Sequence, residues 1–134
     1  MLLQNKINSE SCLCGSDQDY QHCCFLFHNE DSYPETAEQL MRSRYVAYAK
    51  QLTPYLLKTW HSAERPDSLT FDKGVVWTKL MIDGKKKGRK KDREGWVAFT
   101  AFYKIKFENR QLREKSFFSR DENNHWCYVN GTFF

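Results

Sequence analysis

Four cysteines fall within thirteen residues near the start of the sequence: Cys12, Cys14, Cys23 and Cys24. A segment this short cannot bury an apolar core, so a bound metal or a cross-link has to supply its folding energy. The thiolate is a soft, compact ligand, and Zn²⁺ binds four such ligands in a tetrahedron. Gly15 and Ser16 follow the first pair, where the chain must reverse around an ion. We therefore predict a structural Zn²⁺ site that uses all four cysteines.

Two other chemistries suit cysteines at this spacing: a disulfide framework, as in small secreted domains, and a redox-sensing zinc thiolate site. No apolar leader precedes the cysteines, and only one more cysteine follows them, at Cys127. We therefore expect a reduced, cytoplasmic protein whose thiolates bind a metal. Cys127 lies between two aromatic residues and is expected to be a small core residue. No apolar run approaches the roughly 18 residues that a membrane span needs.

The positive charge is concentrated in one stretch. The chain has a formal net charge of +4, yet the segment 85–93 carries seven cations and one acid, so the remainder has a net charge of −2. Clustered cations bind phosphates by releasing counterions, which makes this segment a candidate contact for RNA or a ribonucleoprotein. The alternative is a solubilising hairpin tip, because its lysines have no interleaved aromatic residue for stacking on bases. The candidate docking residues are Lys85, Lys86, Lys87, Arg89, Lys90, Lys91 and Arg93.

The chain after the cysteines is predicted to change from helix to strand. Thr36 is a suitable N-cap, and apolar residues recur at helical spacing over residues 37–50. Pro54 begins a second short helix, which is expected to end at Trp60. Strands with period-two alternation follow at 74–83, 96–107, 112–120 and 125–129, with the lysine-rich stretch as the first hairpin loop. Helices followed by consecutive antiparallel strands indicate an α+β domain with helices packed on one face of a curved sheet.

The cysteine segment also resembles a named motif. Residues 12–24 read Cys-Leu-Cys-Gly-Ser-x-x-x-Tyr-x-x-Cys-Cys, which is similar to the SEC-C zinc motif. Asp17, Gln18 and Asp19 stand where that motif usually has glycine and lysines. The substitution removes the positive face that lets such knuckles bind acidic partners or lipid surfaces. We therefore expect protein or ribonucleoprotein partners rather than a membrane.

The resemblance extends along the chain. Residues 36–45, which contain Met-Arg-Ser-Arg-Tyr, and residues 55–61, 114–118 and 126–129 resemble the YchJ family. That family joins a SEC-C knuckle to a domain similar to nuclear transport factor 2 and ketosteroid isomerase. The resemblance implies a cone in which a bent antiparallel sheet wraps around helices and often leaves a pocket. It implies a zinc knuckle at 1–28, a linker at 29–35 and the nuclear transport factor 2-like domain at 36–134, and it implies no particular activity.

Arg44 falls in the middle of the apolar face of the helix at 37–50. A buried guanidinium without a partner is costly, so we expect an acid near it. On the strand at 112–120, Glu114 shares a face with Leu112 and Phe118, which should point inward. We predict that Arg44 and Glu114 come within hydrogen-bond distance in the concavity. The pair is either a structural ion pair or the anchor for an anion or polar ligand.

Catalysis of the ketosteroid isomerase kind needs a carboxylate base opposite an acidic donor. Glu114 is the candidate base, with Tyr45, Tyr48 or Tyr55 as the donor. An arginine partner would keep Glu114 strongly acidic and therefore a weak base near neutral pH, so we expect a protein that is not an enzyme. His61 lies at the end of the second helix, where it either interacts with the helix dipole or lines the mouth of the pocket.

These patterns support two functions. The first is a non-enzymatic, zinc-bearing binding module that docks on a protein or ribonucleoprotein through the knuckle and the basic segment. The second is a small-molecule pocket protein, or an enzyme, built around Arg44 and Glu114. An open concavity of several hundred Å³ lined by Tyr and Phe would favour the second function, and a concavity filled by those side chains would favour the first.

Overall fold

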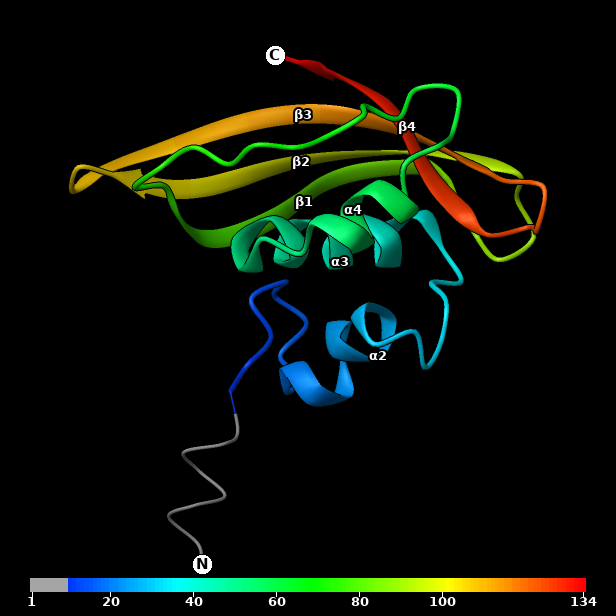
Figure 1. Cartoon of the computed structure of the whole chain (residues 1–134), viewed down its shortest axis with the longest axis horizontal. Coiled ribbons are helices and arrows are strands. Elements are labelled where there is room, and N and C mark those ends of the chain that lie inside the picture. The colour runs from blue at the N-terminus through cyan, green and yellow to red at the C-terminus, as the bar shows by residue number, and fades with distance from the viewer. Residues whose placement is uncertain (1–9) are drawn as a thin grey trace, which may run out of the picture.

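The structure is a computed structural model that describes residues 10–134 (Figure 1). It is an α+β fold in which helices precede a four-stranded antiparallel sheet, as the sequence predicts. No helix among these residues has the length and apolar content to cross a bilayer. The elements are the 3₁₀ turn η1 (Tyr20–His22), the helices α2 (Cys24–His28), α3 (Ala37–Lys50) and α4 (Thr53–Lys58), and the strands β1 (Val76–Lys87), β2 (Glu94–Ile105), β3 (Glu108–Arg120) and β4 (Trp126–Phe133).

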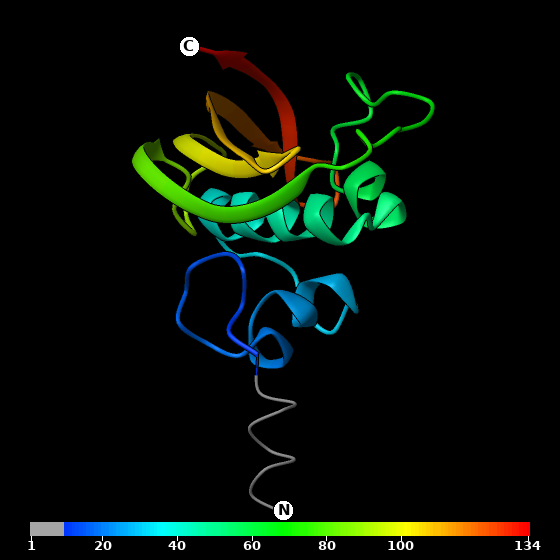
Figure 2. The ribbon, with the colours of Figure 1, turned by 90° about the vertical axis from the view of Figure 1, so that its left-hand side faces the viewer.

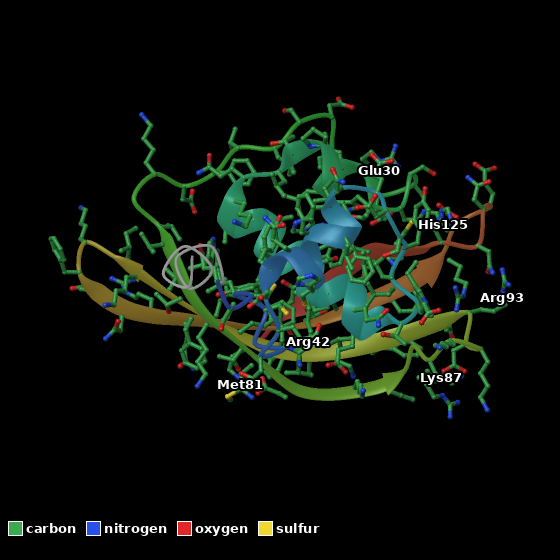
Figure 3. All side chains as sticks on the ribbon, turned by 90° about the horizontal axis from the view of Figure 1, so that it is seen from below. Glu30, Arg42, Met81, Lys87, Arg93 and His125 are labelled. Atoms are coloured by element: carbon green, nitrogen blue, oxygen red, sulfur yellow. The ribbon has the colours of Figure 1, made fainter. Side chains whose placement is uncertain are left out.

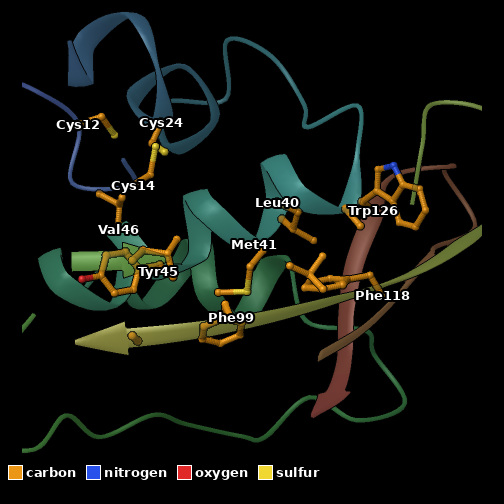
Figure 4. Packing of buried hydrophobic residues seen from close by; sticks show 14 residues of the cluster. Cys12, Cys14, Cys24, Leu40, Met41, Tyr45, Val46, Phe99, Phe118 and Trp126 are labelled. Atoms are coloured by element: carbon orange, nitrogen blue, oxygen red, sulfur yellow. The ribbon is translucent and has the colours of Figure 1, made fainter. Parts of the chain in front are cut away.

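Helix α3 forms the centre of the molecule, with the bounds that the sequence predicts. Thr36 caps its start by accepting a backbone N–H hydrogen bond at 3.1 Å. Met41 and Tyr45 face Phe99 of the sheet, whereas Val46 on the opposite side faces the cysteines (Figure 4). Because both sides are covered, α3 is buried around most of its circumference rather than along one stripe.

The four strands form a meander in the order β1-β2-β3-β4, and every neighbouring pair is antiparallel. Register shifts interrupt the β1–β2 ladder twice and the β3–β4 ladder once. Such bulges bend a sheet locally, and this sheet curves over α3 (Figure 2). Val97, Phe99, Ala101 and Phe118 alternate along β2 and β3 and are buried on the concave face. That face therefore makes the core with α3, and none of the helices in the described part of the chain lies on the convex face.

Several boundaries differ from the sequence prediction. Strand β1 continues to Lys87, and Lys86 pairs with Trp96, so the first three lysines of the basic segment lie in a strand rather than a loop. Strands β2 and β3 meet in a two-residue turn at Lys106 and Phe107, with φ of 52° and 66°. Turns with two positive φ angles normally carry Asn or Gly, so these residue types gave no turn signal. The predicted turn at 108–111 is therefore strand, α4 ends before residue 60, and β4 continues past residue 129.

The cysteine knuckle packs directly on α3 (Figures 1 and 2). Its buried cysteines belong to the same apolar cluster as Leu40 and Met41. The connecting residues 29–35 are also held in place, because Tyr33 stacks on His125 with ring centroids 3.8 Å apart. The knuckle and the sheet therefore cover opposite sides of one helix.

Candidate functional site

The four cysteine side chains converge in the knuckle, and all four Sγ atoms lie within 4.8 Å of one another. The Sγ of Cys23 lies 3.6 Å from that of Cys14 and 4.0 Å from that of Cys24. A tetrahedral site with Zn–S bonds of about 2.3 Å has edges of about 3.8 Å, so the cluster has the right size. These separations are those of ligands around an ion and far exceed the roughly 2.05 Å of a disulfide bond. The donor set and the spacing are those of a thiolate metal site.

Local backbone geometry brings the two cysteine pairs together. Gly15 turns the chain with a φ of 87°, in the left-handed region that favours glycine, and its N–H donates to the carbonyl of Cys12 at 3.2 Å. Ser16 Oγ lies 3.1 Å from the Sγ of Cys23. Hydrogen bonds among the thiols, led by the one with Cys12, lower the pKa of Cys14. The same interactions raise the pKa of Cys12 to about 11 and raise that of Cys24 as well. The cluster therefore favours one thiolate, at Cys14, and a thiolate is the form that binds a cation.

Arg42 fastens the knuckle to α3. Its Nη1 donates to the carbonyl oxygen of Cys14, and its Nε donates to Glu38 at 2.9 Å. Figure 3 shows Arg42 beside the knuckle, on the side of α3 away from the sheet. The sequence predicts that Arg42 points away from the apolar face of the helix but gives it no partner in the knuckle, because a backbone acceptor leaves no pattern in the residue types.

His28 makes a second link between the knuckle and α3. Its Nε2 lies 2.8 Å from the carbonyl oxygen of Ser43, which can only accept, so Nε2 carries the proton. Its Nδ1 then accepts from the hydroxyl of Tyr20, also at 2.8 Å. Burial lowers the pKa of His28, which keeps the ring neutral in this arrangement. The sequence indicated no partner for His28, because both partners come from segments that are brought close only by folding.

Arg44 is buried, with 3% of its surface exposed. Its Nη1 donates to the carbonyl of Leu56 at 2.8 Å and to Thr59 Oγ1 at 2.7 Å. The guanidinium carbon lies 5.0 Å from the ring centroid of Trp60 and 4.7 Å from that of Tyr128. Burial lowers the pKa of Arg44, but an arginine stays protonated at neutral pH. The concavity therefore holds a buried cation that is supported by neutral groups.

Glu114 faces the concavity as predicted, but its predicted contact with Arg44 is wrong. Across residues 10–134, no ion pair or hydrogen bond joins the two side chains. Glu114 Oε2 instead accepts from Ser116 Oγ at 2.8 Å and from the Tyr128 hydroxyl at 3.0 Å. Tyr128 thus links the two charges, since its ring contacts Arg44 and its hydroxyl contacts Glu114. Burial and the Glu114 carboxylate raise the pKa of Tyr128, so its hydroxyl keeps its proton.

A cavity of about 250 Å³ opens between α3 and the concave face of the sheet. Arg44 and Glu114 both line it, and most of its other walls are aromatic or aliphatic. The concavity is therefore open rather than filled, as expected for a pocket protein, although its volume is smaller than the several hundred Å³ of that expectation. The other lining residues are Met41, Tyr45, Tyr48, Trp77, Phe99, Ala101, Leu112, Ser116, Tyr128 and Phe133.

Besides Arg44 and Glu114, two predicted pocket residues line this cavity and one does not. Tyr45 and Tyr48 are both lining residues, and burial raises the pKa of each phenol. His61 lies elsewhere: its backbone N–H donates to the carbonyl of Tyr128 at 2.8 Å, and its Nδ1 accepts from the N–H of Ala63 at 3.2 Å. The ring of His61 therefore stabilises the turn after α4. His61 is not a lining residue of this cavity, so the pocket-mouth alternative is wrong.

The basic segment is partly neutralised within the fold. Ion pairs join Lys85 to Glu38, Arg89 to Asp92, and Lys90 to Glu35. Figure 3 shows Lys87 and Arg93 at the end of the sheet, where β1 and β2 are connected. Each nearby acid reduces the local positive potential, so the segment offers less free charge than its composition suggests. The exposed cations without an ion pair in this stretch of the described chain are Lys86, Lys87, Lys91 and Arg93.

The fold and the two sites define a class of protein: a cysteine knuckle with a metal-binding donor set, packed on a domain like nuclear transport factor 2. Residues 9–26 match the model of the SEC-C motif, and residues 36–131 match the model described as "YchJ, middle NTF2-like domain". The solution structure of a SEC-C motif containing protein from Rhodopseudomonas palustris has a similar fold, with a TM-score of 0.79 and 26% identity. That match covers 92% of this chain and 98% of the other.

The chain belongs to the YchJ family, as the resemblance implied. It is 40% identical over 124 residues to a UPF0225 protein from Streptomyces avermitilis, a match that covers 92% of this chain and 85% of the relative. It is 41% identical over 125 residues to a UPF0225 protein from Chromobacterium violaceum, covering 90% of this chain and 91% of the relative.

Proposed function

We propose that this protein binds a small carboxylate-bearing ligand in the cavity around Arg44, on a helix that a structural Zn²⁺ knuckle holds in place. The observation that carries the proposal is the buried guanidinium, which lines an open cavity and, within residues 10–134, forms no ion pair with an acid. A buried cation of this kind gains most from an anion that enters with the ligand. A carboxylate is the anion that matches the planar fork of an arginine.

The cavity walls describe the rest of the ligand. Phe99 and Leu112 offer apolar contact to a ring or an alkyl chain. Glu114 offers its second oxygen to a hydroxyl or amine on the ligand, since Oε2 already accepts two hydrogen bonds. We propose binding rather than catalysis, because a fold by itself implies no chemistry.

The volume of the cavity, about 250 Å³, lies just below the range of about 300–1,000 Å³ for drug-sized ligands. Phenylacetate is a suitable probe, because it joins a small ring to one carboxylate, and phenylacetamide is its uncharged match. Phenylacetate should raise the melting temperature of the metal-loaded protein, and phenylacetamide should not. The Arg44→Gln variant should lose the response and Arg113→Gln, on the opposite face of the sheet, should keep it. An equal response to both compounds would contradict the proposal.

Zinc is our proposal for the metal of the knuckle, because four thiolates in a tetrahedron suit Zn²⁺ better than the harder divalent cations. Elemental analysis of the purified protein should find one Zn²⁺ per chain, and Cys14→Ser should reduce it. A different metal at full occupancy would contradict the assignment. We also propose a cytoplasmic location, since a reducing compartment keeps such thiols available to a metal.

Docking on a protein or ribonucleoprotein through the basic segment stays a second proposal. The exposed cations of that segment support it, and the ion pairs of Lys85, Arg89 and Lys90 weigh against it. Replacing Lys91 and Arg93 with glutamine should weaken capture of a partner if the segment is the contact. Unchanged binding would leave the segment as a solubilising tip.

A further inference from the structure

The convex face of the sheet bears cations that neither the knuckle nor the cavity uses. On β2 and β3, residues that alternate with the buried ones belong to this face, and the register places residues of β1 beside them. The cations at these positions are all exposed: Lys79, Lys86, Lys104, Arg113 and Lys115. The acids there are Asp83, which accepts a hydrogen bond from Thr100, and Glu94 at the start of β2.

Aromatic rings lie between these cations. Trp96 and Phe117 are opposite each other on β2 and β3, with ring centroids 5.0 Å apart. Lys86 Nζ lies 5.4 Å from the ring centroid of Trp96, and Lys79 Nζ lies 5.8 Å from that of Phe102. All three rings are partly exposed. Cations beside partly open rings supply the two contacts that single-stranded nucleic acids use, one with phosphates and one with bases.

Charge decides which partner this face can take. A second copy of the chain, packed face to face, would bring two sets of five cations together against few acids, which is repulsive. An anionic partner gains from the same charges. A lipid surface would be held by a continuous band of apolar side chains that enters the acyl boundary. The apolar side chains of this face, which include the exposed Val76 and Met81, are instead interleaved with cations along the strands.

We propose that the convex face binds single-stranded RNA, with Trp96 and Phe117 stacking on bases and Lys86, Arg113 and Lys115 contacting phosphates. This surface lies on the opposite side of the sheet from the cavity, so it does not depend on the ligand proposed above. It shares only Lys86 with the predicted contact of the basic segment and otherwise uses different residues. The sequence pattern missed it because strand pairing, and not sequence proximity, brings the rings to the cations.

The test is fluorescence anisotropy of a labelled oligouridylate with the metal-loaded full chain across a salt titration. Trp96→Ala should weaken binding about tenfold, and Trp96→Phe should restore most of it, because stacking on one base is worth about 1–3 kcal/mol. Lys115→Gln should reduce the slope of log affinity against log salt by about 0.7. The loop variant Lys91→Gln/Arg93→Gln is the matched control and should bind like the parent protein.

The same assay can overturn the proposal. Equal binding by Trp96→Ala and the parent would exclude stacking, and equal binding of duplex RNA would exclude single-strand preference. Binding only to anionic phosphatidylglycerol vesicles would assign the face to a membrane, and self-association without RNA binding would assign it to a second copy. If Trp96→Ala fails to fold, the exposed Lys115→Glu substitution decides, because it should weaken RNA binding without disturbing the core.

Discussion

Removing the metal should destabilise the whole domain and not the knuckle alone. Loss of the knuckle would expose Val46, whose burial is worth about 2 kcal/mol. It would also break the hydrogen bonds that Arg42 and His28 make across the boundary, worth about 1 kcal/mol each. The total of about 4 kcal/mol is a large part of the roughly 5–15 kcal/mol that stabilises a typical domain.

Tryptophan fluorescence during urea unfolding measures this directly, because all four tryptophans lie outside the knuckle, at positions 60, 77, 96 and 126. A strong chelator should lower the free energy of unfolding by about 4 kcal/mol, from the contacts counted above. Cys14→Ser should reproduce the effect without chelator, and Cys127→Ala should keep the response of the parent protein. If verified metal-free protein unfolds at the same urea concentration as the loaded protein, the knuckle does not support α3 and the reasoning fails.

Three further predictions follow from particular residues. Asn and Gly in place of Lys106 and Phe107 should raise the free energy of unfolding by about 1 kcal/mol in urea titrations, because both positions have a positive φ; a loss of stability would contradict the turn. Gly88→Ala should lower the free energy of unfolding in the same urea titrations, since a Cβ there would lie 2.8 Å from that of Ala37 and the φ is +78°; an unchanged free energy of unfolding would contradict this packing. Burial lowers the pKa of His28 below its ordinary 6.5, so its contribution to stability is complete above pH 6.5 and is lost as the pH falls toward the folded-state pKa. His28→Gln should lose less stability than the parent protein as the pH falls below 6.5. An identical dependence of stability on pH in the two proteins would refute this role of His28.

The residue types were enough to predict the elements whose chemistry is local. Thr36 and the spacing of the apolar residues predicted where α3 begins and ends. The alternation of Leu112, Glu114 and Phe118 predicted which face of β3 points inward. The four cysteines were predicted to converge, and they do. In each case the signal is a short-range pattern that one element carries by itself.

The missed features all depend on segments far apart in the chain. The sequence predicts an acidic partner for Arg44, because a buried positive charge has to be stabilised. In the structure, Thr59 and the rings of Trp60 and Tyr128 provide part of this stabilisation. Neutral acceptors and ring faces leave no charge pattern for a sequence to reveal. The sequence predicts one loop for the basic segment, because composition does not show that β1 extends into it.

The most direct test of the central claim is the ¹³C-methyl NMR signal of Met41, which lines the cavity beside Arg44. Met81 on the convex side of β1 is exposed and serves as an internal reference (Figure 3). Titration of phenylacetate into the metal-loaded protein should shift the Met41 signal to saturation, leave Met81 in place, and have no effect on Arg44→Gln. A Met41 signal that stays in place, or one that shifts equally in Arg44→Gln, would contradict an anion-binding cavity in this protein.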